Sequence, residues 1–314
     1  MSQPSAQPSQ TAARPAGNAL LVIAWMTGTL LSFSTVAVSI RELSGTIGVF
    51  DILALRNVAG IIILVSVAIA YPSLREGFRP RRMGLHLQRN VIHFFGQYAW
   101  ALGVTLLPLA MVFAIEFTTP AWVALFAFLL LGEKLTAPRL IAIALGFIGI
   151  LVILRPAPGS LDPTGLIVLG AAICFALTTI ATKRLTGTEG TFAILLWMNV
   201  MQLPMNYLGA DKLFFLQIPD LPLLPLIGIC VGGLSAHFCL TNAYRHGDAV
   251  IVVPLDFLRL PLIALIGWFL YTEALDPFIF AGGALILIGI LQNLRAEHRR
   301  NQAARASIPK LKDE

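Results

Sequence analysis

Residues 33–58 read FSTVAVSIRELSGTIGVFDILALRNV, and residues 175–200 read FALTTIATKRLTGTEGTFAILLWMNV. The two segments align at a shift of 142 positions and share glycine, asparagine and phenylalanine as well as common apolar residues. The identical pairs are Phe33/Phe175, Leu43/Leu185, Gly45/Gly187, Gly48/Gly190, Phe50/Phe192, Ile52/Ile194, Leu53/Leu195 and Asn57/Asn199. A shift of 140 positions then pairs Glu133 with Glu273 and Arg155 with Arg295. Matched polar residues and glycines are rare coincidences in an apolar chain, so we expect an internal duplication.

The composition around this repeat is that of a membrane protein. Of the 314 residues, 57% are hydrophobic and 12% are charged, and the mean hydropathy is +0.81. A soluble domain carries about 25% charged residues, and a membrane-spanning helix needs about 20 apolar residues. The expected spans are 18–40, 47–70, 87–107, 108–131, 137–154, 163–182, 191–210, 222–244, 248–271 and 275–294. The sequence therefore predicts an all-α integral membrane protein with ten transmembrane helices.

The duplication divides these helices into two halves. We expect a disordered tail over 1–17, five helices over 18–156, five more over 157–295 and a basic cytoplasmic tail over 296–314. Because five is an odd number, the second half enters the membrane in the opposite sense. Inverted repeats of this kind are common in alternating-access transporters.

Charge distribution predicts the orientation. With the N-terminus in the cytoplasm, 17 of the 22 Lys and Arg residues fall on the cytoplasmic side and 3 on the other side. Short cytoplasmic loops are enriched in Lys and Arg. We expect a multi-pass protein of the bacterial inner membrane with both termini in the cytoplasm.

Several classes of function are disfavoured by what the sequence lacks. The net charge of +6 is spread over short loops and the C-terminus, which argues against a nucleic-acid partner. Cys174, Cys230 and Cys239 lie in apolar stretches without metal-ligand spacing, so no metal or cofactor is expected. The sequence contains no GxxxxGK[ST] loop for ATP, no HExxH motif and no nucleophile with a base, so neither a primary pump nor an enzyme with catalytic residues is indicated. A channel would need a continuous polar pore, whereas the polar residues gather near one level.

The stretch IEFTTPAWVALFAFLLLGEKLTAPRLIAIALGFIGILVILRP (115–156), its weaker echo at 255–295 and the ten-helix duplication resemble the EamA branch of the drug/metabolite transporter superfamily. The resemblance covers residues 18–295. It implies a transporter whose central cavity is lined chiefly by the helices that are first, third, fourth, sixth, eighth and ninth in the chain, with the fifth and tenth more peripheral. Relatives carry amino acids, vitamins, nucleotide-like metabolites and organic amines, so the resemblance does not name the substrate.

Ionisable residues within the spans are candidates for substrate binding or coupling, because each costs about 2.5–3.5 kcal/mol at the centre of a membrane helix. They are Glu116, Asp256, Arg259 and Arg56, and the two acids are related by the 140-residue shift. A carboxylate there can exchange a proton or neutralise a substrate amine. Alternatively, Asp256 and Arg259 simply pair at i and i+3 on one helix face. Arg56 either binds a substrate carboxylate or ties neighbouring helices together.

Four uncharged or weakly basic residues form a second group of candidates. Gln97 and His237 are related by the same shift, and Tyr98 and Trp100 lie beside Gln97. His237 can bind a substrate or relay protons near neutral pH, or it can bond a neighbouring helix. Tyr98 and Trp100 can stack on an aromatic solute.

Prolines and small residues predict features of the backbone. Pro120 and Pro261 occupy nearly equivalent places beside the acids, and we expect each to kink its helix and to act as a hinge. Small residues allow helices to approach closely. The expected close-packing positions are Ala142, Gly146, Gly149, Gly282 and Gly289.

Together these features predict a secondary or facilitative transporter that moves a small polar metabolite by alternating access. The paired acids and arginines favour an amino acid, an amine or a related zwitterion, and proton coupling is left open. The alternative is an aromatic or vitamin-like solute bound by stacking. The expected partners are the solute, membrane lipid and, where transport is coupled, protons, and the protein is expected to be a monomer or a homodimer.

Overall fold

The computed structural model describes residues 19–131, 136–155, 163–246 and 249–306. This part of the chain is helical and contains no strand. The elements are α1 (Ala19–Leu43), α2 (Val49–Ala70), η1 (Pro72–Phe78), α3 (Met83–Leu106), α4 (Leu109–Glu116), α5 (Thr119–Leu131), α6 (Ala137–Leu154), α7 (Pro163–Leu185), α8 (Thr191–Gly209), η2 (Phe214–Asp220), α9 (Leu223–His246), α10 (Ala249–Phe257), α11 (Arg259–Tyr271) and α12 (Pro277–Ala306). The predicted all-α class is confirmed.

Length and apolarity explain why these segments form membrane helices, since a spanning backbone must satisfy its hydrogen bonds internally. Within the described residues, eight helical segments are long and apolar enough to cross a membrane. They lie at Leu20–Leu43, Val49–Ala70, Leu109–Leu130, Ala137–Leu154, Pro163–Leu185, Leu223–His246, Ile251–Tyr271 and Pro277–Arg300. Helices α3 and α8, with 24 and 19 residues, are not among these eight segments, and both carry buried amide side chains. The count of ten spans therefore stays a prediction.

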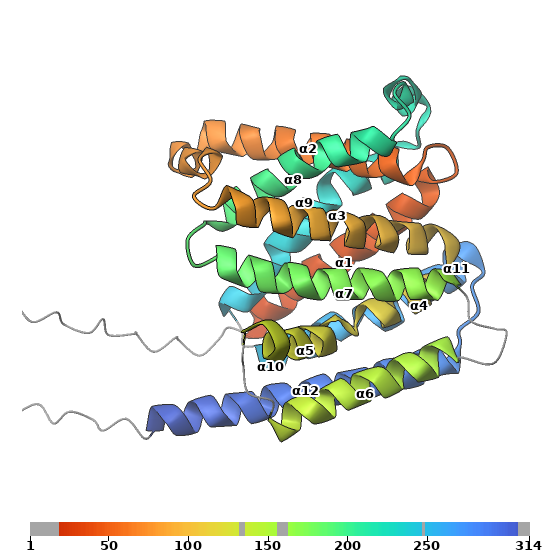
Figure 1. The fold of residues 1–314 in the computed structure, drawn as a ribbon. Helices are drawn as coiled ribbons and strands as arrows, with labels where there is room; N and C mark the ends of the chain where they lie inside the picture. The colour runs from red at the N-terminus through yellow and green to blue at the C-terminus, as the bar shows by residue number, and fades with distance from the viewer. Residues whose placement is uncertain (1–18, 132–135, 156–162, 247–248, 307–314) are drawn as a thin grey trace, which may run out of the picture.

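Helices from the two halves of the chain pack against each other in pairs. α1 packs against α9, and α3 packs against α7. At one edge of the bundle α2 lies beside α8, and at the opposite edge α6 lies beside α12 (Figure 1). The centre of the molecule is therefore surrounded by helices contributed by both halves.

Two of the apolar segments are broken near the middle. α4 ends at Glu116 and α5 begins at Thr119, and α10 ends at Phe257 and α11 begins at Arg259. Pro120 and Pro261 lie in the first turn after each break, where a proline removes no hydrogen bond of the preceding half-helix. Their action as hinges stays a prediction.

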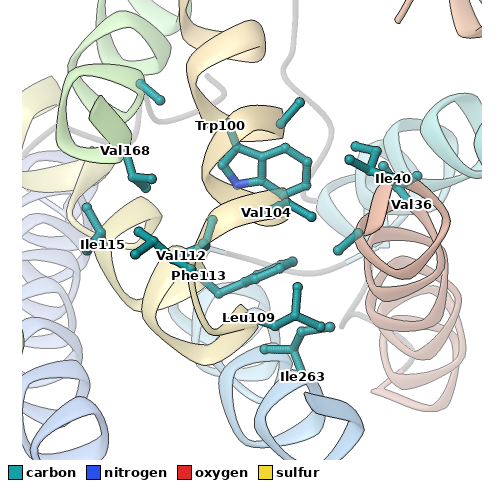
Figure 2. Close-up of a cluster of buried hydrophobic side chains, with 14 of the residues drawn as sticks. Val36, Ile40, Trp100, Val104, Leu109, Val112, Phe113, Ile115, Val168 and Ile263 are labelled. Atoms are coloured by element: carbon teal, nitrogen blue, oxygen red, sulfur yellow. The ribbon is translucent and has the colours of Figure 1, made fainter. Parts of the chain in front are cut away.

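A hydrophobic layer fills the space between α1, α3, α4 and α11. Figure 2 shows these side chains converging beside the ring of Trp100. The layer consists of Val36, Ile40, Val104, Leu109, Val112, Phe113 and Ile263, each at most 5% exposed. Packing this dense excludes water from that part of the bundle.

The predicted close packing of small residues is realised between α6 and α12, inside one chain. A Cβ on Gly149 would lie 2.7 Å from the Gly282 carbonyl oxygen, and a Cβ on Gly289 would lie 3.1 Å from the Cα of Ala142. The glycines on α6 and α12 thus allow these two helices of the same chain to pack closely.

Replacing Gly149 by alanine should lower the melting temperature of the purified protein by several degrees. The added methyl group would overlap the backbone of α12, and overpacking of this kind costs about 1–3 kcal/mol. Gly170→Ala in α7 is the matched control, because no atom lies within 4 Å of the new Cβ. Equal melting temperatures for the two variants would contradict the close approach of α6 and α12.

The last helix continues beyond its predicted end at residue 294. α12 runs to Ala306, so the first part of the predicted C-terminal tail is helical. The predicted tail over 1–17, the boundary at 156/157 and the end of the C-terminal tail lie outside the described residues.

Candidate functional site

The two helix breaks bring three charged residues from both halves of the chain together. Arg259, the first residue of α11, lies with Nη2 3.3 Å from Asp256 Oδ2 and 3.5 Å from Glu116 Oε1. The Arg259 side chain is 5% exposed, and those of Glu116 and Asp256 are 20% and 22% exposed. We call Glu116, Asp256 and Arg259 the ion triad. The i, i+3 pair expected from sequence is present, and Glu116 joins it from the other half.

Hydrogen bonds and helix ends orient the triad. Trp100 Nε1 donates to Glu116 Oε2 at 2.7 Å. Glu116 ends α4, where the helix dipole disfavours a negative charge, and the nearby Arg259 guanidinium offsets this. Within the described residues, Asp256 Oδ1 and Arg259 Nε are buried without a hydrogen-bond partner. Because buried polar groups are normally paired, these two atoms are candidates for contact with a solute.

Aromatic rings surround the guanidinium of the triad. The Arg259 Cζ lies 4.6 Å from the ring centroid of Phe33, 4.9 Å from that of Phe117 and 5.2 Å from that of Phe113. Phe117 in turn stacks on Phe257 at 4.2 Å. Each ring face attracts the cation and keeps water away from it. The centre is therefore charged but lined mainly by phenylalanine.

A polar stripe on α3 leads to the triad. Its residues recur every three or four positions, which places them on one helix face: His86, Asn90, His93, Gln97 and Trp100. Gln97 is 5% exposed, and neither its Nε2 nor its Oε1 has a hydrogen-bond partner among the described residues. An unpaired buried amide costs about 1–3 kcal/mol, so Gln97 is a strong candidate for contact with a solute.

The remaining predicted residues divide between the centre and the packing around it. Arg56 of α2 has a buried Nη2 without a partner among the described residues. His237 of α9 packs edge-on against Phe33, with ring centroids 5.8 Å apart, and Phe33 also contacts Arg259 of the ion triad. Tyr98, by contrast, stacks on Phe50 of α2 at 4.2 Å. The structure thus gives Tyr98 a packing partner rather than a contact with the triad.

Three residues on α1 and α3, namely His93, Arg89 and Phe33, were not singled out by the sequence. His93 Nδ1 lies 2.8 Å from Gln202 Nε2 of α8, and Arg89 donates to Thr182 Oγ1 at 2.8 Å. Phe33 joins His237 to Arg259. Arg89 counted as a cytoplasmic loop charge in the sequence, yet it lies in α3 and is 6% exposed. The three- and four-residue spacing of polar side chains along α3 was the available signal for His93 and Arg89.

Within the described residues, no group of three His, Cys, Asp or Glu side chains is placed to hold a metal ion. The groups at the ion triad and around it are carboxylates, cations, amides and aromatic rings.

Comparisons with known proteins agree on the class of molecule. The model of the EamA-like transporter family matches residues 20–155 and again residues 163–295. A riboflavin transporter of Rhizobium johnstonii is 34% identical over 220 residues, which cover 69% of this chain and 72% of that protein. A riboflavin transporter of Brucella anthropi is 31% identical over 251 residues, covering 77% and 88%. An S-adenosylmethionine uptake transporter of Rickettsia conorii is 24% identical over 265 residues, covering 84% and 89%.

A protein of known crystal structure shares the fold. It aligns with a TM-score of 0.57 and 17% identity over 89% of this chain and 97% of its own. The family match spans both halves of the chain, and the relatives are named as transporters. The chain belongs to the EamA-like transporter family, within the drug/metabolite transporter superfamily, and is a multi-pass membrane transporter of small molecules rather than an enzyme.

Proposed function

We propose that the protein transports a flat, vitamin-type aromatic solute, with riboflavin as the first compound to test. The relatives from Rhizobium johnstonii and Brucella anthropi are named riboflavin transporters, and the one from Rickettsia conorii is named for S-adenosylmethionine. Riboflavin joins a fused nitrogen heterocycle to a hydroxylated ribityl chain, and S-adenosylmethionine joins one to a ribose ring that carries a sulfonium and an amino-acid group. A site for either needs aromatic surface together with hydrogen-bonding groups.

The main support for this proposal is that both acids of the ion triad already contact other side chains. Glu116 and Asp256 both contact Arg259, and Glu116 also accepts from Trp100. A substrate ammonium would have to compete with this guanidinium for the carboxylates. The unpaired amide of Gln97 has no such competitor among the described residues, and Phe33 is the one ring around Arg259 that stays partly exposed. The geometry thus favours an aromatic solute bound by stacking over an amino acid or an amine. Transport of an amino acid or an amine stays a prediction, to be tested by screening such compounds.

The ring system of the solute would then meet Phe33, which is partly exposed, and its polar edge would meet α3. Aromatic pairs prefer offset or edge-on arrangements and contribute about 0.5–1.5 kcal/mol beyond their buried area. An amide such as that of Gln97 offers both a donor and an acceptor, which matches the alternating carbonyl and N–H groups of a flavin edge.

Gln97→Ala should lower riboflavin uptake about tenfold or more while leaving the melting temperature unchanged or raised, since it removes a solute contact and an unpaired buried amide at once. Uptake is measured in a riboflavin-requiring bacterium that lacks its own transporter, and melting on the purified protein. A purely structural residue would change both quantities in the same direction.

Gln217→Ala serves as the matched control, because Gln217 lies in η2 away from α3. We expect its uptake and melting temperature to match the wild type. If the wild-type chain supports no riboflavin uptake, and riboflavin leaves its melting temperature unchanged, the flavin proposal fails, and the screen moves to S-adenosylmethionine, amino acids and amines.

We further propose that transport proceeds by alternating access through ten spans arranged as two inverted halves in the bacterial inner membrane, with both termini in the cytoplasm. The pairing of α1 with α9, of α3 with α7 and of α2 with α8 supports this, since each pair joins opposite halves. The two broken segments, α4–α5 and α10–α11, occupy corresponding places and meet at the ion triad. Proton exchange at Glu116 or Asp256 belongs to the same proposal.

A further inference from the structure

Four basic side chains on α2, α3 and α9 form a group of which one member, His237, adjoins the ion triad through Phe33. Arg56 of α2 lies against α9, since a Cβ on Gly233 would stand 3.6 Å from the Arg56 Cδ. His237 follows Gly233 by one turn of α9, and Arg89 and His93 are one turn apart on α3. His93 and His237 each interact electrostatically with both arginines and with each other. We call Arg56, Arg89, His93 and His237 the basic cluster.

The partners of the basic cluster are uncharged. Arg89 donates to Thr182 Oγ1 at 2.8 Å and to Asn90 Oδ1 at 2.7 Å. His93 pairs with Gln202, and Arg56 Nη2 is buried with no hydrogen-bond partner among the described residues.

The nearest carboxylates are committed to other groups. Glu116 and Asp256 contact Arg259, and Glu189 lies 3.5 Å from His86 Nε2 and accepts from two backbone N–H groups. Across the described ranges, no Asp or Glu forms an ion pair with any member of the basic cluster.

An uncompensated buried charge is costly. Arginine does not deprotonate in proteins, so Arg56 and Arg89 keep their charges wherever they are buried. Buried charges are normally paired, and a guanidinium fork fits the two oxygens of a carboxylate or phosphate. The cluster therefore has the composition of an anion site whose negative charge is supplied from outside the protein.

We infer that the basic cluster binds an acidic group, a carboxylate or a phosphate monoester, on the aromatic solute. This inference rests on the proposed function, because the cluster adjoins the aromatic centre through the contact of His237 with Phe33. The ring system lies near Phe33 and Gln97, and the acidic group extends toward Arg56. Among aromatic solutes, the protein should therefore prefer those that carry an acidic group, such as riboflavin 5′-phosphate over riboflavin.

The test compares matched pairs of compounds on the purified full-length protein. Riboflavin is compared with riboflavin 5′-phosphate, and nicotinamide with nicotinate, by calorimetry and by the rise in melting temperature. The acidic member of at least one pair should bind about tenfold more tightly or better, as expected for charge-assisted hydrogen bonds. Inorganic phosphate, the smallest probe, should also raise the melting temperature.

Arg56→Gln should reduce this preference to within about twofold, and Arg56→Lys, which keeps the charge but loses the fork, should retain part of it. If Arg56→Gln does not fold, His237→Gln removes a second member of the cluster. Arg79→Gln is the matched control, because Arg79 is exposed and lies outside the bundle centre.

The two proposals fail separately. If riboflavin binds, but neither acidic compound binds more tightly than its neutral counterpart and inorganic phosphate does not raise the melting temperature, the anion site is wrong and the flavin proposal stands. If nicotinate is preferred through Arg56 while neither flavin binds, the anion site stands and the flavin proposal is wrong. The absence of any preference for an acid, in both pairs and with inorganic phosphate, overturns the inference.

Discussion

Arg259→Gln is expected to abolish transport and to lower the free energy of unfolding by about 3–5 kcal/mol, the cost of leaving buried charges without their partner. The guanidinium is the cation that both Glu116 and Asp256 contact, and its side chain is 5% exposed. Without it, two carboxylates face each other across the helix breaks. Thermal unfolding in detergent and solute uptake in cells measure the two effects separately.

Two further variants separate charge from geometry. Arg259→Lys keeps the positive charge but loses the fork that reaches both acids, so we expect most of the stability and only part of the transport. Combining Arg259→Gln with Asp256→Asn removes one of the stranded charges. This double variant should recover part of the lost stability, and it should not recover transport.

The outcome also decides between substrate classes. If Arg259→Gln melts and transports like the wild type, the acids do not depend on the guanidinium and are free to bind a substrate ammonium. The amine class would then replace the aromatic class as the leading proposal. A large loss of stability shows instead that the acids are held by Arg259, as the 3.3 Å and 3.5 Å contacts indicate.

Much of the fold could be predicted because lipid restricts what an apolar chain can form. Hydropathy and length predicted the helices, and the repeat predicted that α4–α5 and α10–α11 occupy corresponding places. Pro120 and Pro261 indicated where these segments are interrupted, since a proline is readily accommodated in the first turn of a new helix. Each of these predictions depends on short stretches of sequence, and the helices and their interruptions lie in the structure where those stretches indicate.

The site was less predictable because its contacts join residues far apart in the chain. The pair of Asp256 and Arg259 follows from helical spacing, whereas the contact of Arg259 with Glu116 depends on how α4 packs against α11. Phe33 is one of many apolar residues of α1, and only tertiary packing places it between His237 and Arg259.

Glu273→Gln is expected to open the face of the bundle at which α1 ends. The Glu273 carboxylate pairs with the Arg41 guanidinium and accepts from the Leu109 backbone N–H at 2.8 Å, at the N-terminus of α4, where the helix dipole favours a negative charge. Arg41 Nε donates to the Val104 carbonyl at 2.8 Å. Arg41 and Glu273, which we call the latch, therefore join α1, α3, α4 and the end of α11.

The latch bonds to the backbone of two residues of the hydrophobic layer, Val104 and Leu109, and we expect both the latch and the layer to part when a solute passes this face. A hydrogen bond to a charged group contributes about 1.5–3 kcal/mol, so losing the charge should raise the ratio of open to closed molecules about tenfold to a hundredfold. Ile40→Cys, at a position 1% exposed within the layer, reports opening through its rate of labelling by a thiol reagent. The background replaces Cys174, Cys230 and Cys239 by serine.

Gly267→Ala tests the same contact without changing any charge. Its Cβ would stand 2.2 Å from Glu273 Oε2 and would push the carboxylate away from Arg41 and Leu109. We expect Gly267→Ala and Glu273→Gln to accelerate labelling of the introduced thiol alike, and Gly170→Ala, which meets no atom within 4 Å, to leave it unchanged. Labelling at the wild-type rate in both variants would mean that the hydrophobic layer alone closes this face. Faster labelling in both assigns the closure to one ion pair between the two halves of the chain, which is the kind of contact that alternating access must break and remake in each cycle.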